Sequence, residues 1–417
     1  MWQAAEVRGW CPGALRPMAS GDGLIVRVRP RVGVYPVAAL AGVADAARRW
    51  GNGVLDLTRR GNLQIRGASA ATLEGITEAL AAGGLLDATA AAEAVRNVLV
   101  NPLAGIDPTE AQDLRPVARA LEALLVTDPG LQALPGKFGF LVDGGGLLSL
   151  AGEPADIRLV AAGGGVLIGV ERPGGFAVAA REPCERAAAT AAAIARALVP
   201  ALHGSHRRAR LLPDEVICRL LGFSGEAAAA PISGRPGPPV LGRVEGDGGP
   251  IAVGVAAAFG RIEADALATL VGQLTAAGVR DVRVSPWRAI YAPIRDGEAA
   301  DRILDGARAA GFITDPGDPL LAVDACPGAP ACPAASVDTR AAARALAPHL
   351  GGLGLRSLHV SGCAKGCARS APADLVLVGG GGRFGVVRHG TADTPPVELV
   401  AAGELTDILA REVAGHV

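Results

Sequence analysis

The sequence predicts an α+β fold built from an internally duplicated unit. Residues 24–58 (LIVRVRP…VAALAGVADAARRWG…VLDLT) match residues 251–285 (IAVGVAA…ADALATLVGQLTAAG…DVRVS) at a constant offset of 227 positions, without a gap. A second pair follows, because 155–160 (ADIRLV) matches 373–378 (ADLVLV) at an offset of 218 positions. The two copies occupy about 20–215 and 245–417, and a stretch rich in Pro and Gly separates them.

Each copy begins with a strand, continues with a helix and returns to a strand. The segments 36–50 and 264–277 carry apolar residues at i, i+3 and i+4 spacing, whereas the flanking runs alternate as strands do. The paired segments 155–160 and 373–378 are each followed by glycines and a further apolar run, which predicts hairpins. The glycine tracts lack the Lys-Ser/Thr ending of a phosphate-binding loop, so we interpret them as hairpin turns.

Four of the seven cysteines gather near the C-terminus at C-x5-C and C-x3-C spacing: Cys326, Cys332, Cys363 and Cys367. Prolines exclude a regular helix around the first pair, and the second pair follows a short β-like run. Four thiolates from two loops suit a [4Fe–4S] cluster, because each iron takes one protein sulfur. Structural zinc, which prefers closer pairs, and four unrelated buried thiols are the alternatives. An odd cysteine count argues against a disulfide framework.

Polar residues follow the first repeat, in LDLTRRGNLQIRG. If 58–66 is extended, one face of the strand presents Arg60, Asn62, Gln64 and Arg66. The 227-residue offset places Trp287, Ala289 and Tyr291 opposite the first three of these. This difference suggests that one copy lines an anion-binding site and that the other copy is structural. Further cations stand at Arg96, in RNVLVNP, and at Lys137, in LPGKF.

Composition narrows the classes of partner. The 417-residue chain has length for two or three domains, and half of its residues are apolar. Only 19% are charged and the net charge is −1, which gives no electrostatic case for a nucleic-acid or membrane-surface partner. No apolar stretch approaches the roughly 20 residues that span a bilayer. The segment MWQAAEVRGW has no signal-type apolar core, so we expect a cytoplasmic protein.

With these residues assembled, the chain resembles the sulfite/nitrite reductase superfamily over nearly its full length. The resemblance rests on the duplicated halves, TRRGNLQIRG, RNVLVNP, LPGKF and the cysteine quartet. It implies ferredoxin-like half-domains at 15–80 and 250–305, paired by pseudo-twofold symmetry. It also implies α/β domains at 81–226 and 306–417, a linker at 227–249, and a cluster carried by the second α/β domain.

The superfamily also implies roles for single residues. In the reductases, residues in the positions of Arg60, Arg96 and Lys137 bind the substrate oxyanion, so we expect these three to be catalytic here. A second lysine of many sulfite reductases is replaced by Gly139. The cysteine in the position of Cys367 would also bridge the cluster to sirohaem iron in those enzymes.

Within the superfamily, the chain looks most like the precorrin-3B synthase family. The opening CPGALRPMASGDGLIVRVRP and the cluster region HVSGCAKGCARS, followed by ADLVLVG, carry this likeness. It implies an O2-dependent monooxygenase of aerobic cobalamin (vitamin B12) biosynthesis that hydroxylates precorrin-3A at C20 and closes a γ-lactone. The implied cofactors are a [4Fe–4S] cluster and a mononuclear non-haem iron, with NADH as the electron source. A sirohaem-dependent sulfite or nitrite reductase is the alternative, and an electron carrier without enzymatic activity is a third hypothesis.

Precorrin-3A bears many ionised acetate and propionate groups, so its pocket should be basic. We predict that the substrate contacts Arg60, Asn62, Gln64, Arg66, Arg96 and Lys137. Ligands of the mononuclear iron stay unassigned: His203 and His206 form a candidate pair or a solvated helix face, His359 lies near the cluster loop, and Cys11 is a ligand or a small buried residue. We expect a monomer that receives electrons from a donor protein.

Overall fold

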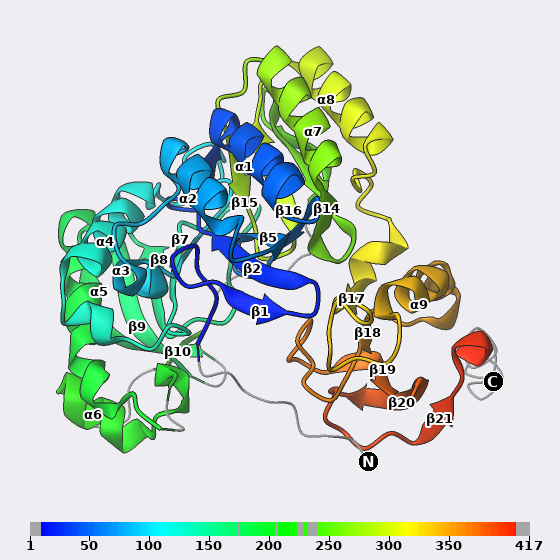
Figure 1. The fold of residues 1–417 in the computed structure, drawn as a ribbon. Helices are drawn as coiled ribbons and strands as arrows, with labels where there is room; N and C mark the ends of the chain where they lie inside the picture. Colours follow the sequence, from blue (N-terminus) through cyan, green and yellow to red (C-terminus); the bar gives the residue numbers. More distant parts are fainter. Residues whose placement is uncertain (1–9, 173–174, 205–206, 223–228, 232–239, 406–417) are drawn as a thin grey trace.

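The computed structural model describes residues 10–172, 175–204, 207–222, 229–231 and 240–405, which form four β-sheets with helices packed on them (Figure 1). Part of the predicted linker at 227–249 lies outside the described residues. Within the described part of the chain, no helix is both long and apolar enough to cross a bilayer.

Two five-stranded sheets contain the duplicated strands. The first sheet, in spatial order, consists of β1 (Met18–Ser20), β2 (Gly23–Val28), β5 (Leu63–Ala68), β4 (Val54–Leu57) and β14 (Arg261–Glu263). The second consists of β12 (Gly242–Gly246), β13 (Gly249–Ala256), β16 (Ala289–Pro293), β15 (Asp281–Val284) and β3 (Val34–Pro36).

Each of these sheets takes its last strand from the other half of the chain. Strand β14 pairs with β4 in the first sheet, and β3 pairs with β15 in the second. The exchanged strands begin 227 residues apart, as do β4 and β15, so the repeat seen in the sequence is confirmed. The exchange joins the two halves through backbone hydrogen bonds.

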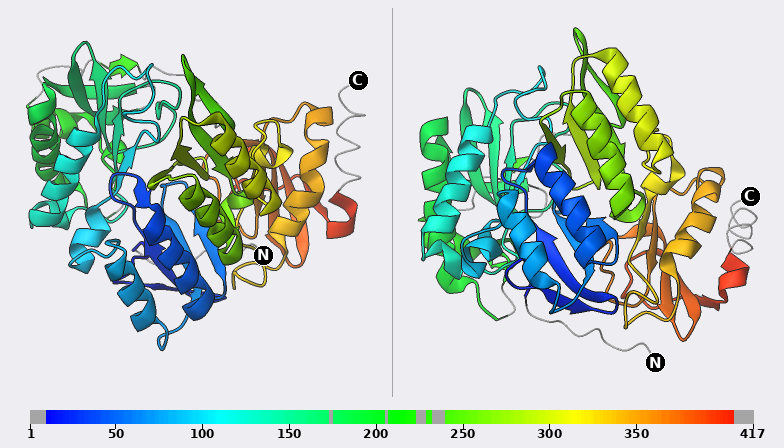
Figure 2. Two further views of the ribbon diagram at one scale, coloured as in Figure 1. Left: turned by 90° about the horizontal axis from the view of Figure 1, so that it is seen from above. Right: turned by 45° about the horizontal axis from the view of Figure 1, so that its top comes forward.

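Four helices lie over these two sheets: α1 (Val37–Trp50), α2 (Leu73–Ala82), α7 (Ala264–Ala276) and α8 (Gly297–Ala309) (Figure 2). The first buries Val37, Leu40, Val43, Ala44 and Ala47, which recur with helical spacing. A single hydrophobic core combines residues of α1 and α7 with residues of both sheets, so the half-domains fold as one unit. The predicted helices 36–50 and 264–277 differ from α1 and α7 by one residue each.

Two outer sheets share one topology. The first consists of β6 (Val98–Val100), β7 (Phe140–Asp143), β8 (Ile157–Ala162), β9 (Gly165–Arg172), β10 (Gly175–Glu182) and β11 (Ala229–Pro231). The second consists of β17 (Val323–Ala325), β18 (Leu358–Ser361), β19 (Ala373–Gly380), β20 (Arg383–Gly390) and β21 (Glu398–Val400). In each sheet the first three strands are parallel and the following pairs are antiparallel.

Helices cover both outer sheets. The first packs against α3 (Ala90–Val95), α4 (Arg115–Thr127), α5 (Cys184–Leu198) and α6 (Asp214–Leu221). The second packs against α9 (Thr339–Leu346). Figure 1 shows these two units on opposite sides of the paired half-domains.

The prediction of one extended run over 58–66 is wrong for its first part. Residues 59–61 form a turn, in which Gly61 has φ of +62° and its N–H donates to the Thr58 carbonyl (3.0 Å). The Thr58 hydroxyl accepts hydrogen bonds from the backbone of Arg60 (3.3 Å) and Asn62 (3.2 Å). The strand begins only at Leu63, so Arg60 and Asn62 are presented by a loop.

Candidate active site

The cysteine quartet lies at one edge of the second outer sheet. Cys326 directly follows β17, and Cys363 comes two residues after the end of β18. These strands are parallel neighbours, with Ala325 opposite Val360. Because parallel strands end at the same edge of a sheet, both cysteine loops leave from one place.

Electrostatic interactions connect the four thiols. Desolvation, together with the charges of Cys326, Cys363 and Cys332, raises the pKa of Cys367 to about 11, although Lys365 acts in the opposite direction. Cys326 is buried, whereas Cys367 is exposed. The sulfur atom of Cys326 accepts a hydrogen bond from the backbone N–H of Gly362 (3.1 Å), which joins the two loops directly.

Glycines permit this close approach. A Cβ atom at position 362 would lie 2.6 Å from the Cβ of Ala335, so only glycine fits beside the first loop. Gly366, between the last two cysteines, has φ of +60°, in the left-handed region. This conformation turns the chain between Cys363 and Cys367.

The donor set fits a [4Fe–4S] cluster. Four thiols come from two adjoining loops, as such clusters require, and each would bind a different iron. His359, on β18, is fully buried, and neither ring nitrogen has a hydrogen-bond partner among the described residues. Burial lowers the pKa of His359 to about 4, so the ring is neutral at pH 7 and retains one N–H donor. A cluster sulfide is a suitable acceptor for such a donor.

The described residues do not include a set of ligands for a mononuclear iron. Among the described residues, the cysteine quartet included, no three His, Cys, Asp or Glu side chains are grouped so that they could hold a single metal ion. His203 is exposed, and His206, its predicted partner, lies outside the described residues. Cys11 is half-buried and hydrogen-bonds with Arg27. The described residues therefore do not fit a two-histidine, one-carboxylate site, and we derive no chemical step through such an iron.

A cavity of about 350 Å³ connects the cluster loop with the first half of the chain; we call it the central cavity. Its charged and polar lining residues are Arg59, Arg60, Asn62, Arg96, Asn97, Glu153, Arg208, Arg210, Cys367 and Ser370. Five of these residues are arginines and one is a carboxylic acid, and each arginine except Arg60 forms an ion pair with a carboxylate that does not line the cavity, among the described residues. The lining is thus rich in guanidinium groups, of which Arg60 is the one without a carboxylate partner among the described residues, and it includes the predicted cluster ligand Cys367.

Among the predicted anion-binding residues, Arg60 has the environment that best fits this role. Its guanidinium donates to the Lys137 carbonyl (3.2 Å), and no ion pair joins it to a carboxylate among the described residues. Arg60 is partly open to solvent, yet desolvation by the surrounding protein, and then the charge of Arg208, lowers the pKa of Arg60 to about 10. The side chain is still cationic at pH 7, and a bound anion would reduce the repulsion from Arg208.

Arg96 lines the same cavity but is held by the protein. Its guanidinium forms ion pairs with Asp87 (2.8 Å) and Glu122 (3.6 Å) and is almost fully buried. Burial favours a lower pKa, but the hydrogen bond to Asp87 and the charge of Glu122 outweigh it, so the pKa of Arg96 is raised. Much of its hydrogen-bonding capacity is thus used internally.

Three other predicted substrate contacts lie outside the cavity wall. Arg66 is buried in an ion pair with Asp22 (2.6 Å). Gln64 can accept from the guanidinium of Arg27 when its amide oxygen faces that group. Lys137 has an exposed side chain and offers only its carbonyl, to Arg60. The structure therefore groups Arg60, Asn62 and Arg96 and separates the others from them.

Sequence reasoning missed several cavity residues. Arg208 forms an ion pair with the fully buried Asp156 (3.0 Å), and the basic run RRAR at 207–210 was the available signal. Burial raises the pKa of Glu153, the carboxyl group of the cavity, although the charge of Arg59 opposes this. No sequence pattern distinguished Glu153, because its position depends on the fold of the loop after β7.

Arg59 also joins the cavity to the cluster unit. Asp324, two residues before Cys326, forms ion pairs with Arg59 (3.4 Å), Arg288 (2.9 Å) and Arg369 (3.1 Å). These arginines come from the first repeat, the second repeat and the cluster loop. One carboxylate thus holds together the parts that surround the central cavity.

The second repeat differs as the sequence suggested. Ala289 and Tyr291 are fully buried in the core of the second outer unit. Trp287 is partly buried against Leu141, Leu150 and Ala155. These positions pack the core, whereas Arg60 and Asn62 line the cavity.

Comparisons with known proteins agree with this architecture. Residues 16–83 match the nitrite/sulfite reductase ferredoxin-like half domain. A precorrin-3B synthase of Sinorhizobium sp is 35% identical, over 98% of this chain and 88% of its own length. The chain belongs to the precorrin-3B synthase family.

More distant relatives match smaller parts. A ferredoxin–nitrite reductase of Leptolyngbya laminosa is 29% identical, over 37% of this chain and 31% of its own length. The Mycobacterium tuberculosis NirA protein superposes with a TM-score of 0.72 at 22% identity, covering 94% of this chain and 80% of NirA. The precorrin-3B synthase family thus shares the sulfite/nitrite reductase fold predicted from the sequence.

Proposed function

We propose that the chain is a precorrin-3B synthase that hydroxylates precorrin-3A at C20 with O2 and forms the γ-lactone. The observation that carries this proposal is the central cavity. Its lining includes four arginines and the predicted cluster ligand: Arg59, Arg60, Arg208, Arg210 and Cys367. An arginine-lined cavity suits a substrate with many carboxylates, and full-length similarity to a precorrin-3B synthase supports the same reaction.

The arginines have a binding role in this proposal. Arg60 lacks a carboxylate partner among the described residues, so it can donate to a substrate acetate or propionate without breaking an ion pair. Arg208 is fixed by Asp156 and contributes positive charge at a defined position. Arg96 is held by Asp87 and Glu122 and acts as part of the cavity wall.

Glu153 is the group suited to proton transfer. Its raised pKa makes the carboxyl more basic than a solvated one, and it lies among the arginines that would hold the macrocycle. We assign to its carboxyl oxygen the uptake or release of a proton as the lactone closes. Asn62, two residues after Arg60 in the same loop, would help to orient the substrate.

The cluster is placed to deliver electrons. A [4Fe–4S] cluster held by Cys326, Cys332, Cys363 and Cys367 would supply single electrons, with NADH as the ultimate source and a donor protein between them. Two electrons and two protons reduce the second oxygen atom of O2 to water. The proposal places this reaction in the cytoplasm, in a monomeric enzyme.

The size of the cavity limits how the substrate binds. A tetrapyrrole with its carboxylate arms exceeds about 350 Å³, so only part of the macrocycle fits within the described walls. We infer that one edge of the ring, bearing the reacting carbon, enters the cavity. The remaining arms would then extend beyond its mouth.

The test is incubation of anaerobically purified protein with precorrin-3A, reductant and 18O2. We expect a product heavier by one labelled oxygen atom, detected by mass spectrometry, with no product when O2 is omitted. Precorrin-3A recovered unchanged from protein with full iron and sulfide content would refute the proposal.

A sirohaem-dependent reductase is the second candidate, favoured by the partial matches to nitrite reductases. Cys367 lies in the cavity wall, where the corresponding reductase ligand would bridge to sirohaem. The absorption spectrum separates the candidates: a Soret band with red bands supports the reductase, and a broad shoulder alone supports the synthase.

A further inference from the structure

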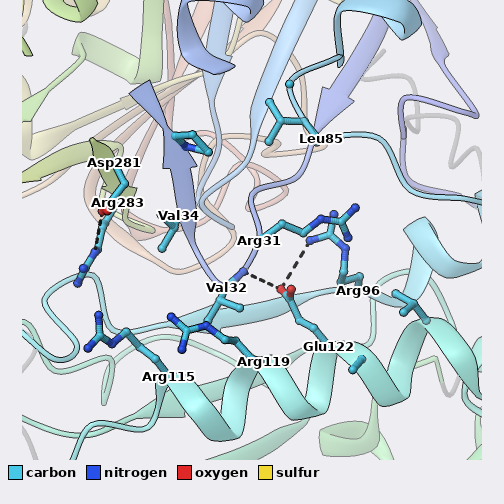
Figure 3. Close-up of a pocket in the computed structure, with 15 residues that line it drawn as sticks. Arg31, Val32, Val34, Leu85, Arg96, Arg115, Arg119, Glu122, Asp281 and Arg283 are labelled. Carbon is cyan, nitrogen blue, oxygen red and sulfur yellow. Dashed lines mark hydrogen bonds and ion pairs between the residues drawn. The ribbon is translucent and has the colours of Figure 1, made fainter. Parts of the chain in front are cut away.

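A second cavity, of about 470 Å³, lies on the other side of Arg96; we call it the outer cavity. It is bounded by α4, by the exchanged strand β3 and by β15, so both halves of the chain contribute to it (Figure 3). Its charged lining residues are Arg31, Arg96, Arg115, Arg119, Glu122, Asp281 and Arg283. The proposed reaction uses only Arg96 of these.

Ion pairs account for most of these charges. Arg31 pairs with Asp87, Arg96 with Asp87 and Glu122, and Arg115 with Asp113 (2.7 Å). Arg119 differs, because neither an ion pair nor a hydrogen bond involves its guanidinium among the described residues. Its five N–H donors therefore face the cavity and solvent without a protein acceptor.

Arg283 provides a second incompletely bonded guanidinium. The residue is only 7% exposed, and its Nη1 donates to the Ala104 carbonyl (2.7 Å). Its buried Nε lies 3.5 Å from Asp281 Oδ1, in an ion pair that is too long for a good hydrogen bond. Asp281 therefore compensates the charge of Arg283 but leaves this N–H poorly hydrogen-bonded.

These groups lie together. Figure 3 shows the guanidinium ends of Arg115, Arg119 and Arg283 on one side of the cavity, with Arg31, Arg96 and Glu122 on the other. The charge of Arg115 contributes to a lowered pKa of Arg283, after the larger effect of burial. Val34, Leu85 and Val126 supply an apolar wall next to these cations.

We propose that the outer cavity binds a small organic oxyanion, a carboxylate or a phosphate ester, through Arg115, Arg119 and Arg283. The oxyanion accepts hydrogen bonds from Arg119, the positive charges of Arg115 and Arg283 add to the attraction, and the carbon body of the ligand packs on the apolar wall. Arg96 lines both cavities, but Arg115, Arg119 and Arg283 line only the outer one, and the proposal does not depend on the proposed reaction.

Arg119 is the residue to change, because it lines the outer cavity and not the central cavity. Its side chain is exposed, so its removal should not disturb folding. The control is Arg302→Gln on α8, which removes the same charge at an exposed position away from both cavities. Each protein is titrated calorimetrically with isophthalate, the carboxylate probe, and with phenyl phosphate, the ester probe.

We expect at least one probe to bind the wild type and Arg302→Gln equally, and Arg119→Gln at least tenfold more weakly. The probe with the larger loss identifies the class of oxyanion. Equal binding of both probes to wild type and Arg119→Gln overturns the proposal, and so does the absence of binding to the wild type.

A second variant separates charge from geometry. Arg119→Lys keeps the positive charge but loses the planar fork, and we expect affinity between those of the wild type and Arg119→Gln. An Arg60→Ala variant should leave the Arg119-dependent binding unchanged, because Arg60 lines only the central cavity. Loss of that binding in Arg60→Ala would mean that the probe occupies the central cavity, which contradicts the proposal.

Discussion

The two outer units have equivalent loops at the equivalent edge of their sheets, but different kinds of side chain occupy those loops. In the first unit, Asn101 follows β6 and Asp143 ends β7, and their side chains hydrogen-bond to each other (3.1 Å). In the second unit, the corresponding positions after β17 and β18 lead to Cys326 and Cys363. One unit completes its loops with its own polar groups, whereas the other presents thiols to an inorganic core.

The difference shows that, in a duplicated fold, one copy can hold its loops by hydrogen bonds while the other copy carries the reactive residues. Asp143 accepts hydrogen bonds from four groups: Asn101, Gly145, Ser149 and Leu150. The first unit is thereby closed and supplies a rigid wall, while the loop between the first repeat and β5 supplies cations. Variants in each unit should therefore affect different measurable properties.

The largest effect is expected from Cys326→Ser. Loss of one ligand should prevent cluster assembly, and activity should fall more than about 100-fold. Iron and acid-labile sulfide analysis and the visible spectrum measure the cluster. The control is Cys184→Ser, a thiol outside the quartet that accepts from Gln112 (2.9 Å), which should keep both cluster and activity. Full cluster content in Cys326→Ser would contradict our assignment of the quartet.

Asp143→Ala tests the unit closed by hydrogen bonds. The buried donor of Leu150 and the part-buried donor of Gly145 would lose their acceptor, so the free energy of unfolding should fall by about 3–5 kcal/mol. Urea denaturation followed by circular dichroism measures the loss. The cluster spectrum of the folded fraction should be unchanged. A loss below about 1 kcal/mol would show that these bonds do not stabilise the loops.

Arg60→Ala tests the cation loop against its counterpart in the second repeat. Loss of one charged contact to the substrate should lower kcat/KM by about 10- to 100-fold, with the cluster intact. Arg49→Ala, at an exposed position on α1, is the matched control and should retain full activity. A variant of Arg60 without its cluster would mean that Arg60 is structural.

The smallest effect concerns Glu110, in the loop after β6. Burial raises the pKa of Glu110 to about 7, so the folded protein holds a proton that the unfolded chain releases near pH 4.5. Stability should therefore fall by about 1–2 kcal/mol as pH rises from 4.5 to 7. Glu110→Gln should remove this contribution, which urea denaturation at pH 5 and 8 measures. Parallel pH profiles for the two proteins would show that Glu110 does not cause the fall.

The repeat and the cysteine spacing made much of this structure predictable. A constant offset placed α1 and α7 within one residue of their observed limits. The cation face was only partly predictable, because the turn at Gly61 moves Arg60 away from Arg66. Glu153 and Arg208 could not be selected, since their contacts depend on loops that meet only in the tertiary structure.

The exchange of β3 and β14 has a consequence for how the chain acquires its shape during translation. Strand β4 emerges from the ribosome about two hundred residues before β14, its edge partner, has been made. Until then the nascent first half exposes unpaired backbone N–H and C=O groups along that edge, which other chains could capture. If the protein were divided into two polypeptides, the first piece would keep this edge unpaired until the second piece bound to it.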